Sequence, residues 1–363
     1  MILKRSGLVL ASIPTFLFGA WSAAALAIDG PCRGHAATAL VVAWIVLLLG
    51  SCFAMRTFFR ALVVILLLNL AVATWWLGIE PSNDRRWITE NERAPVVEFD
   101  GDIVHIRNVR DFLWRSDTDF TPRWEDRTFD LSTIRAVDIF FSNWGPPKIE
   151  HTIMSWEFDD GRHLAISIET RKEVGEEYSA LLGFFRQFEL FYAVADEHDV
   201  IGVRTNVRGE HVRLYRLSAP PDRARLLLVD YLEHIDRLND KPRWYNALTQ
   251  NCTTTIVQHV RHFDATMDWD WRLIANGSAD SLIYMRGGLD TSIPFDELRR
   301  RSDITAAAQA AGDDENFSTL IRRGLPRMTA AGGAGGPRPT LGSAGPTVKT
   351  RAIPGSPGAS RSQ

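Results

Sequence analysis

Residues 151–170 read HTIMSWEFDDGRHLAISIET, and this stretch decides the fold of the soluble part of the chain. Two runs rich in β-branched and aromatic residues flank the three residues DDG. A three-residue loop that ends in glycine is typical of a bulged β-hairpin. If the strands pair directly across this loop, with Phe158 facing Arg162, then His151 lies opposite Glu169. A slip of one residue would place these two side chains on opposite faces of the sheet.

More short strands are predicted on both sides of this hairpin. They are expected at 96–99, 103–106, 136–141, 190–195 and 212–217. Residues 222–238 carry apolar residues at helical spacing and are expected to form a helix. The sequence therefore predicts an α+β domain with an antiparallel sheet.

A second helix is predicted to follow Asn251, within the run WYNALTQNCTTTI at 244–256. Asparagine is a good N-cap, which places Cys252 in the first turn. The free N–H groups and the positive end of the helix dipole favour a thiolate there and could stabilise an oxyanion. Cys252 is therefore a candidate nucleophile. The alternative is a buried cysteine that packs the end of the helix.

A cysteine nucleophile needs a base within about 2.6–3.2 Å. His259 is seven residues farther along the same helix, about 10.5 Å away along its axis, and His262 is farther still. The base is therefore expected to come from the hairpin, with His151 as the base and Glu169 as the carboxylate that orients it. The alternative for His151 is a strand-end histidine on a solvated face.

Four polar residues are candidates for substrate-binding or supporting roles: Asn251, Tyr245, Ser167 and Arg171. The folded part has no CxxC, HExxH or GxGxxG motif and no residues at metal-ligand spacing, so no metal or cofactor is expected. The net charge of −3 gives no reason to expect nucleic acid as a partner.

Three apolar stretches without charged residues precede this domain and are expected to be transmembrane helices: Gly7–Ile28, Thr38–Met55 and Ala61–Ile79. The basic residues Lys4, Arg5, Arg56 and Arg60 indicate a cytoplasmic N-terminus, with residues 80–363 on the outer side of the membrane. The first stretch also resembles a cleavable signal peptide, and cleavage would leave the large domain outside.

The expected organisation is a membrane region at 1–80, a periplasmic catalytic-like domain at 81–323 and a tail at 324–363. The tail is rich in glycine and proline and is expected to be disordered. Cys52 lies within an apolar run, whereas Cys32 lies in an outer loop. A disulfide between Cys32 and Cys252 is compatible with an oxidising compartment.

Five segments carry a family resemblance that spans about residues 108–263. They are NVRDFLWRSDTDFTPRWEDRTFDL at 108–131, VDIFFSNWGPPKIEHT at 137–152, ISIETRKEVGEEYS at 166–179, FELFYAVADEHDVIGVRTN at 188–206 and PRWYNALTQNCTTTI at 242–256. The chain resembles the bacterial Lnb N-terminal periplasmic domain family. The resemblance implies a circularly permuted papain-like fold of the NlpC/P60 type, in which the histidine strand precedes the cysteine helix. His151 and Cys252 occur in that order.

The eponymous Lnb enzyme moves an acyl chain from the diacylglyceryl group of a lipoprotein to the N-terminal amine of the same lipidated cysteine. The resemblance implies acylation of Cys252 and aminolysis of the thioester, with His151 as base and then acid. Glu169 as the third member rests on the strand register alone. The leading hypothesis is a cysteine acyltransferase or acyl hydrolase in the bacterial inner membrane, with the bilayer and acylated substrates such as lipoproteins as partners. The alternatives are a cysteine amidase or peptidase acting on cell-wall peptides and a non-catalytic periplasmic binding module.

Overall fold

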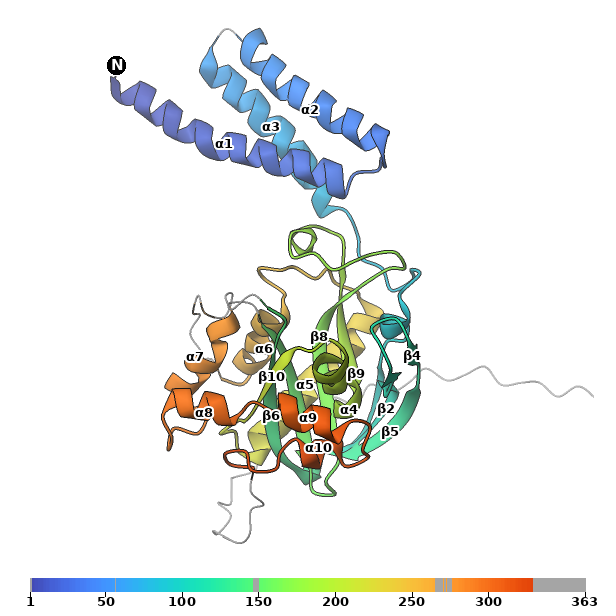
Figure 1. Ribbon diagram of the computed structural model, residues 1–363. Coiled ribbons are helices and arrows are strands. Elements are labelled where there is room, and N and C mark those ends of the chain that lie inside the picture. The colour runs from blue at the N-terminus through green and yellow to red at the C-terminus, as the bar shows by residue number, and fades with distance from the viewer. Residues whose placement is uncertain are drawn as a thin grey trace, which may run out of the picture. The chain divides into compact units, whose positions relative to one another are not determined.

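The computed structural model describes residues 2–55, 57–145, 150–264, 270, 272 and 276–328. Three N-terminal helices precede an α+β domain (Figure 1). Most of the expected tail lies outside the described residues. Its second residue, Leu325, is buried in the α+β domain, so the folded part extends slightly past the expected boundary.

The N-terminal helices are α1 (Ile2–Ile28), α2 (His35–Ala54) and α3 (Phe58–Leu77). By length and composition, α2 and α3 could cross a membrane, and both are mostly exposed, unlike the core helix of a soluble protein. In α1, the apolar part whose side chains the structure describes is Ser12–Ile28. Among the described residues the structure therefore supports two candidate spans, α2 and α3, rather than the expected three.

The end of α1 makes specific contacts with a loop of the α+β domain. Asp29 Oδ2 accepts hydrogen bonds from the indole Nε1 of Trp76 at 2.6 Å and from the backbone N–H of Arg186 at 3.2 Å. Asp29 Oδ1 accepts from the side chain of Gln187 at 2.6 Å. Phe185 packs against apolar residues of α1 and α3. These contacts hold the loop at the ends of both helices.

The central sheet has the strand order β1-β2-β9-β8-β7-β6-β10, and β5 also pairs with β2. Its strands are β1 (Val96–Asp100), β2 (Ile103–Arg110), β5 (Trp124–Asp130), β6 (Ile134–Asn143), β7 (His151–Phe158), β8 (His163–Arg171), β9 (Glu189–Ala195) and β10 (His211–Arg216). The short strands β3 (Leu113–Trp114) and β4 (Phe120–Thr121) form a separate hairpin. The sheet is mixed rather than antiparallel throughout, because β2 and β9 run parallel where Arg110 pairs with Ala195.

The register expected for the hairpin is confirmed. Ile153 faces Ser167 and Glu157 faces His163, so the strands pair directly across the turn. Continuing this register by two residues places His151 opposite Glu169.

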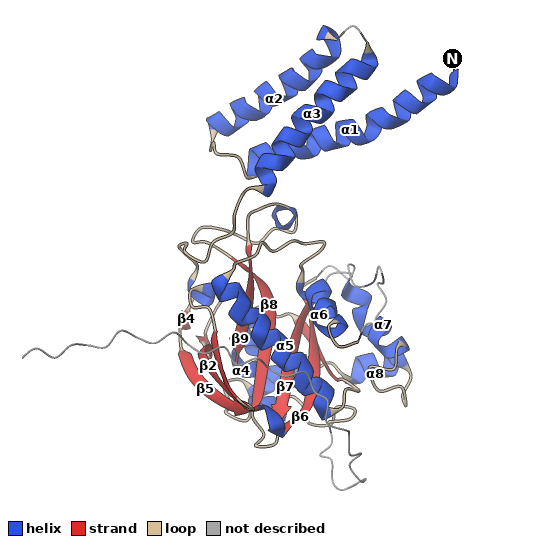
Figure 2. Ribbon diagram, turned by 180° about the vertical axis from the view of Figure 1, so that it is seen from behind, coloured by secondary structure: helices blue, strands red, loops and turns tan. Residues whose placement is uncertain are grey.

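Helices cover both faces of the sheet (Figures 1 and 2). One face carries α5 (Pro221–Asp240), which confirms the helix expected at 222–238, and α6 (Cys252–Arg261). The other face carries α4 (Glu197–Gly202), α9 (Thr305–Ala311) and α10 (Phe317–Leu320). Two further short helices follow α6 in the chain: α7 (Ala279–Met285) and α8 (Phe295–Arg301). Alternate residues of each strand point to opposite faces of the sheet, so Met154 and Trp156 pack in the core beneath α5, whereas Ile153 packs in the core beneath α4, α9 and α10.

A buried charged network ties the end of the described chain to the sheet. The guanidinium of Arg322 donates to both carboxylate oxygens of Glu197 at 2.7 and 2.6 Å and to Asp138 Oδ2 at 3.0 Å. All three residues are buried. Glu197 also accepts from the Ser155 hydroxyl of β7 at 2.5 Å. This network connects α10, α4 and the central strands.

Candidate active site

A cavity of about 420 Å³ contains most of the side chains singled out from the sequence. It is lined by Cys252, His151, Glu169, Asn251 and Tyr245. These residues come from the start of β7, the end of β8, the start of α6 and the segment before α6. Cys252 and His151, which lie 101 positions apart in the chain, thus border the same space.

Asn251 caps α6, as the sequence predicts. Its side chain accepts from the backbone N–H of Thr254 at 2.8 Å, and the Thr254 hydroxyl accepts from the backbone N–H of Asn251 at 3.0 Å. This reciprocal pair is a capping box, which fixes the first turn of the helix. The Asn251 amide also donates to the carbonyl of Ala247 at 2.9 Å. Asn251 therefore holds Cys252 in place.

The environment of Cys252 is buried, with 7 % of the residue exposed. Its Sγ lies 3.9 Å from the Thr253 hydroxyl, which is itself 3.3 Å from the hydroxyl of Thr152. Burial raises the pKa of Cys252 and outweighs the backbone N–H groups of Thr152, Thr253 and Cys252 itself. The expectation of a lowered thiol pKa was therefore wrong. Neither Cys32 nor Cys252 is in a disulfide, so the suggested bond between them is not formed.

Alkylation of Cys252 by iodoacetamide should consequently be slow near pH 6.5 and rise about tenfold per pH unit to beyond pH 8, because only the thiolate reacts. Peptide mass spectrometry can follow this rate, with the free and less buried Cys32 as an internal reference. The slope against pH is the readout, since burial alone slows labelling at every pH. A rate that has already levelled off at pH 7 would show that Cys252 is a thiolate.

His151 is connected to Glu169 through Ser167. The Ser167 hydroxyl lies 2.7 Å from His151 Nε2 and donates to Glu169 Oε1 at 2.8 Å. Arg204 donates to the same Glu169 oxygen at 3.0 Å. The direct separation between His151 Nε2 and Glu169 Oε1 is 4.0 Å. Glu169 therefore orients His151 through Ser167 rather than by the direct contact expected from the register.

The hydrogen bonds that link His151, Ser167 and Glu169 determine the tautomer of His151. A serine hydroxyl has one proton, and that of Ser167 goes to a carboxylate that can only accept. His151 Nε2 must therefore carry the proton that it shares with Ser167, which leaves a lone pair on Nδ1. Among the described residues the structure gives Nδ1 no hydrogen-bond partner. Nδ1 is thus the nitrogen that can act as a base.

The pKa values of His151 and Glu169 are strongly shifted by their surroundings. Burial and the nearby Arg204 together lower the pKa of His151 to about 3, against the opposing effect of Glu169. For Glu169, burial alone would raise the pKa, but Arg204 and Arg110 outweigh it and hold the pKa well below its usual range. At neutral pH the site therefore contains a neutral thiol, a neutral imidazole and a carboxylate.

Replacing Ser167 with alanine should lower turnover about 10- to 100-fold with little change in KM. The imidazole would lose the group that fixes its tautomer, although Glu169 would keep its bond to Arg204. Steady-state kinetics on Ser167→Ala, with the exposed Ser132→Ala as control, would measure this effect. Wild-type turnover in Ser167→Ala would show that the hydroxyl has no part in catalysis.

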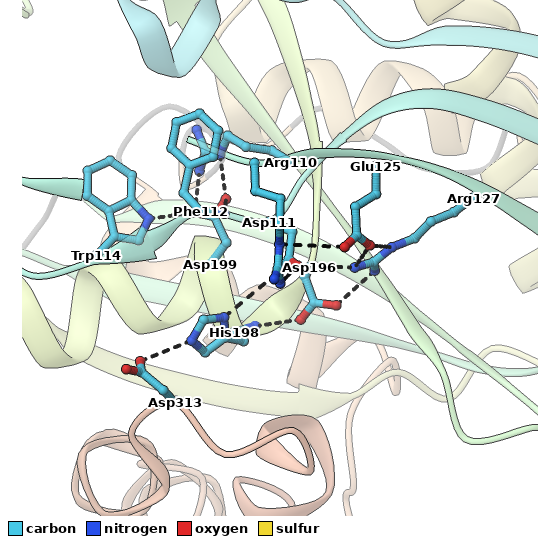
Figure 3. Close-up of polar contacts among 11 residues, drawn as sticks. Arg110, Asp111, Phe112, Trp114, Glu125, Arg127, Asp196, His198, Asp199 and Asp313 are labelled. Carbon is cyan, nitrogen blue, oxygen red and sulfur yellow. Dashed lines mark hydrogen bonds and ion pairs between the residues drawn. The ribbon is translucent and has the colours of Figure 1, made fainter. Parts of the chain in front are cut away.

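One wall of the cavity is built on a buried carboxylate, Asp199 (Figure 3). It accepts from the guanidinium of Arg110 at 2.9 and 3.1 Å, from the backbone N–H of Phe112 at 2.9 Å and from the indole of Trp114 at 2.8 Å. Arg110 and Trp114 line the cavity directly. Four hydrogen bonds to one carboxylate fix Arg110 and Trp114 in this wall.

The mouth of the cavity is largely apolar. Its lining includes three partly exposed aromatic residues: Tyr178 (47 % exposed), Phe184 (44 %) and Trp144 (45 %). Leu181, between the first two, is 65 % exposed. The segment continues directly into Phe185, which packs against α1 and α3. An exposed apolar rim is therefore continuous with the contact to the apolar helices.

Arg171, a candidate for a substrate-binding or supporting role, lies outside the cavity. Its guanidinium donates to the carbonyls of Asn91 and Glu92 at 3.0 and 3.2 Å and to the side chain of Asn83 at 3.1 Å. It also lies over the Trp87 ring, 4.3 Å from the centroid. Arg171 does not line the cavity and instead holds the segment that follows the membrane helices.

Sequence reasoning did not identify Arg204, Thr152 or Tyr178. Arg204 lies in a π-helical turn, Val203–Val207, directly after α4. Such turns are common at functional sites, but the sequence does not mark them. Thr152 could have been noticed, because it neighbours His151 and packs against the residue that follows Cys252.

The fold and cavity define a class of protein: an α+β domain with a cysteine at a helix N-terminus and a buried histidine, preceded by candidate membrane helices. Residues 120–277 match the family described as the Lnb N-terminal periplasmic domain. Comparisons with curated proteins and with solved structures gave no match. The family and the two apolar helices indicate a membrane protein with a periplasmic domain.

Proposed function

We propose that the protein is a membrane-anchored cysteine acyltransferase or acyl hydrolase that acts on lipidated substrates such as bacterial lipoproteins. The observation that carries this proposal is the shared cavity of Cys252 and His151, in which Ser167 holds Nε2 and leaves Nδ1 as the base. The permuted papain-like arrangement inferred from the family resemblance is part of the proposal.

The perturbed pKa values imply how the first step proceeds. A neutral thiol and a neutral imidazole react by general-base catalysis, so the Cys252 proton moves to His151 Nδ1 as sulfur attacks the ester carbonyl. The carbon–oxygen bond to the leaving alcohol then breaks, and the alcohol takes the proton from the imidazolium. Backbone N–H groups at the start of α6 and at Thr152 stabilise the oxyanion.

The second step releases the acyl group from Cys252. An amine or a water molecule gives a proton to His151 Nδ1 and attacks the thioester carbonyl. The carbon–sulfur bond breaks, and the thiolate recovers the proton from the imidazolium. An amine acceptor makes the protein a transferase, whereas water makes it a hydrolase.

The apolar rim supports a lipid substrate. Leu181 and Phe184 would face water at considerable cost unless an apolar partner covers them. The same segment is held at the ends of the apolar helices through Asp29. An acyl chain that leaves the bilayer at that point would reach the cavity along an apolar surface. A soluble cell-wall peptide would gain nothing from this rim.

The test is mass spectrometry of purified full-length protein incubated with a diacylated lipoprotein in detergent. The expected result is a lipoprotein that has lost one O-linked acyl chain, together with a transient mass increase of one acyl group on the peptide that contains Cys252. Detection of the chain on the lipoprotein amine would identify a transferase, and its detection as free fatty acid would identify a hydrolase. An unmodified lipoprotein combined with cleavage of a cell-wall peptide would contradict the proposal.

The topology can be tested separately. We infer that α2 and α3 form a membrane hairpin whose connection, near Arg60, is cytoplasmic. Alkaline phosphatase fused after Ile79 should be active, and phosphatase fused after Arg60 should be inactive, because the enzyme folds only outside the cytoplasm. The reverse pattern would contradict this orientation.

A further inference from the structure

A second cavity, of about 410 Å³, lies between α5 and α6. We call it the basic pocket and define it by the polar residues Arg237, Lys241, Arg243, His234, Thr255 and Gln258. It shares no lining residue with the cavity of Cys252, so the chemistry proposed above leaves it without a role.

Two buried polar atoms of the basic pocket lack partners. Nε2 of His234 and Oγ1 of Thr255 are both shielded from solvent, and neither has a hydrogen-bond partner among the described residues. Thr255 is only 2 % exposed. A buried polar group without a partner is destabilising, and both residues line the same cavity, which indicates that a ligand completes them.

The charge of the pocket is positive. Arg237, Lys241 and Arg243 line it, and Asp240 is the one acidic residue in the lining. Arg237 has a 3.4 Å contact with Glu233 on the exposed side of α5, which is a weak pairing. Across the described parts of the chain, neither Lys241 nor Arg243 forms an ion pair. The surplus positive charge favours an anionic ligand.

The histidines at the edge of the pocket are already satisfied without a cation. Asp230 accepts from His259 Nδ1 at 2.5 Å and from His262 Nδ1 at 2.9 Å. The Tyr192 hydroxyl lies 2.7 Å from His259 Nε2 and donates to it, because the Nδ1 proton is used by Asp230. Asp230, His259 and His262 have the spacing of metal ligands, but the Asp230 oxygens and both Nδ1 atoms are already engaged with one another. The polar atoms of the pocket that still lack partners, His234 Nε2 and Thr255 Oγ1, can therefore donate hydrogen bonds to an anion.

The pocket lies close to the point where the chain leaves the apolar helices. Trp244, next to Arg243, donates its indole N–H to the carbonyl of Ile79 at 3.0 Å. Asn83 donates to the carbonyl of Leu238, on the pocket lining, at 2.8 Å. Ile79 is two residues beyond the end of α3. Anionic head groups at the membrane surface are therefore within reach of this site.

We propose that the basic pocket binds a phosphate group, carried either by an anionic phospholipid or by a soluble phosphate. Arg243, Lys241 and Arg237 neutralise its charge, and the Thr255 hydroxyl and His234 Nε2–H donate to its oxygens. Binding here requires no turnover at Cys252, so failure of the acyl-transfer proposal would leave this one standing.

The experiment uses the full-length protein in a nonionic detergent at constant ionic strength. The probes are inorganic phosphate, dihexanoyl phosphatidylglycerol and dihexanoyl phosphatidylcholine, and the readout is the shift in unfolding temperature with concentration. The variants are Arg243→Gln, Lys241→Gln and Thr255→Val. Arg261→Gln is the matched control, because Arg261 is exposed on the same helix as Thr255 and lies outside the pocket.

Arg243→Gln and Lys241→Gln should each weaken binding about tenfold, the usual value of one charge-assisted hydrogen bond, whereas Arg261→Gln should have no effect. Thr255→Val should weaken binding without destabilising the unliganded protein, because it removes an unsatisfied hydroxyl. Saturation by phosphatidylglycerol but not phosphatidylcholine would identify a head-group site, and saturation by phosphate alone would identify a soluble ligand. Binding that is absent, or equal in all variants, would overturn the proposal. Stabilisation by Zn²⁺ alone, lost in Asp230→Asn, would also overturn it.

Discussion

Replacing Cys252 with serine is expected to lower acyl turnover at least about a thousandfold, the usual scale for loss of a catalytic nucleophile. A serine hydroxyl is a far weaker acid than a thiol, and a neutral imidazole does not compensate for this. His151 is neutral and its environment opposes protonation, so it could not take a proton from a poor acid. The substitution is nearly isosteric and should shift the unfolding temperature by no more than a few degrees.

The measurement is the initial rate of acyl loss from a diacylated lipoprotein, followed by mass spectrometry. Cys32→Ser is the control, because Cys32 is free and lies outside the cavity. Wild-type rates in the Cys252 variant would remove it from the mechanism. The cysteine would then have only the packing role that the sequence left open.

The largest effect on stability is expected from Arg322→Met, which should lower the free energy of unfolding by about 3–5 kcal/mol. Glu197 and Asp138 are both buried, and Arg322 pairs with both of them, whereas Asp138 has a second cation in Arg216. At Glu197, burial alone would raise the pKa, but Arg322 outweighs it and lowers the pKa to about 2. Without the guanidinium, this carboxylate would remain charged in the core or take up a proton.

Urea unfolding of the full-length protein, followed by tryptophan fluorescence, would measure this change. Arg323→Met is the matched control, because the neighbouring Arg323 is exposed and should change stability by less than about 0.5 kcal/mol. Adding Glu197→Gln to Arg322→Met should recover part of the loss, since it removes the unpaired charge. A loss below about 1 kcal/mol in Arg322→Met would show that the network contributes little.

The sequence was sufficient to predict the hairpin and the cysteine helix because both rest on local chemistry. The DDG turn fixed the strand register, and the Asn251 cap fixed the start of α6. The role of Ser167 could not be read in the same way. It lies on the same face as Glu169, two residues away, and either could approach His151. Side-chain rotamers decide between them, and the strand pattern does not specify rotamers.

The degree of burial and the long-range ion pairs are the other features that could not be predicted from the sequence. The argument that a helix N-terminus lowers a thiol pKa is sound, but its strength depends on how much water reaches Cys252. That depends on Tyr178, Tyr245 and other side chains around the cavity. The Arg322–Asp138 contact spans 184 positions, and one arginine among many gives no sign of such a partner. Charge pairing in the core becomes visible only with the fold.

The straight pairing of β7 and β8 makes the catalytic alignment sensitive to insertions far from the cavity. The turn at Asp159–Gly161 begins about 26 Å from His151 along the strand, from eight residues at about 3.3 Å each. One extra residue there would shift β8 against β7 and turn Ser167 and Glu169 away from the imidazole. A change in the length of this turn should therefore disturb the proposed site as directly as a substitution of its side chains. Relatives that keep the cysteine and histidine but differ in turn length would need a compensating bulge to stay active.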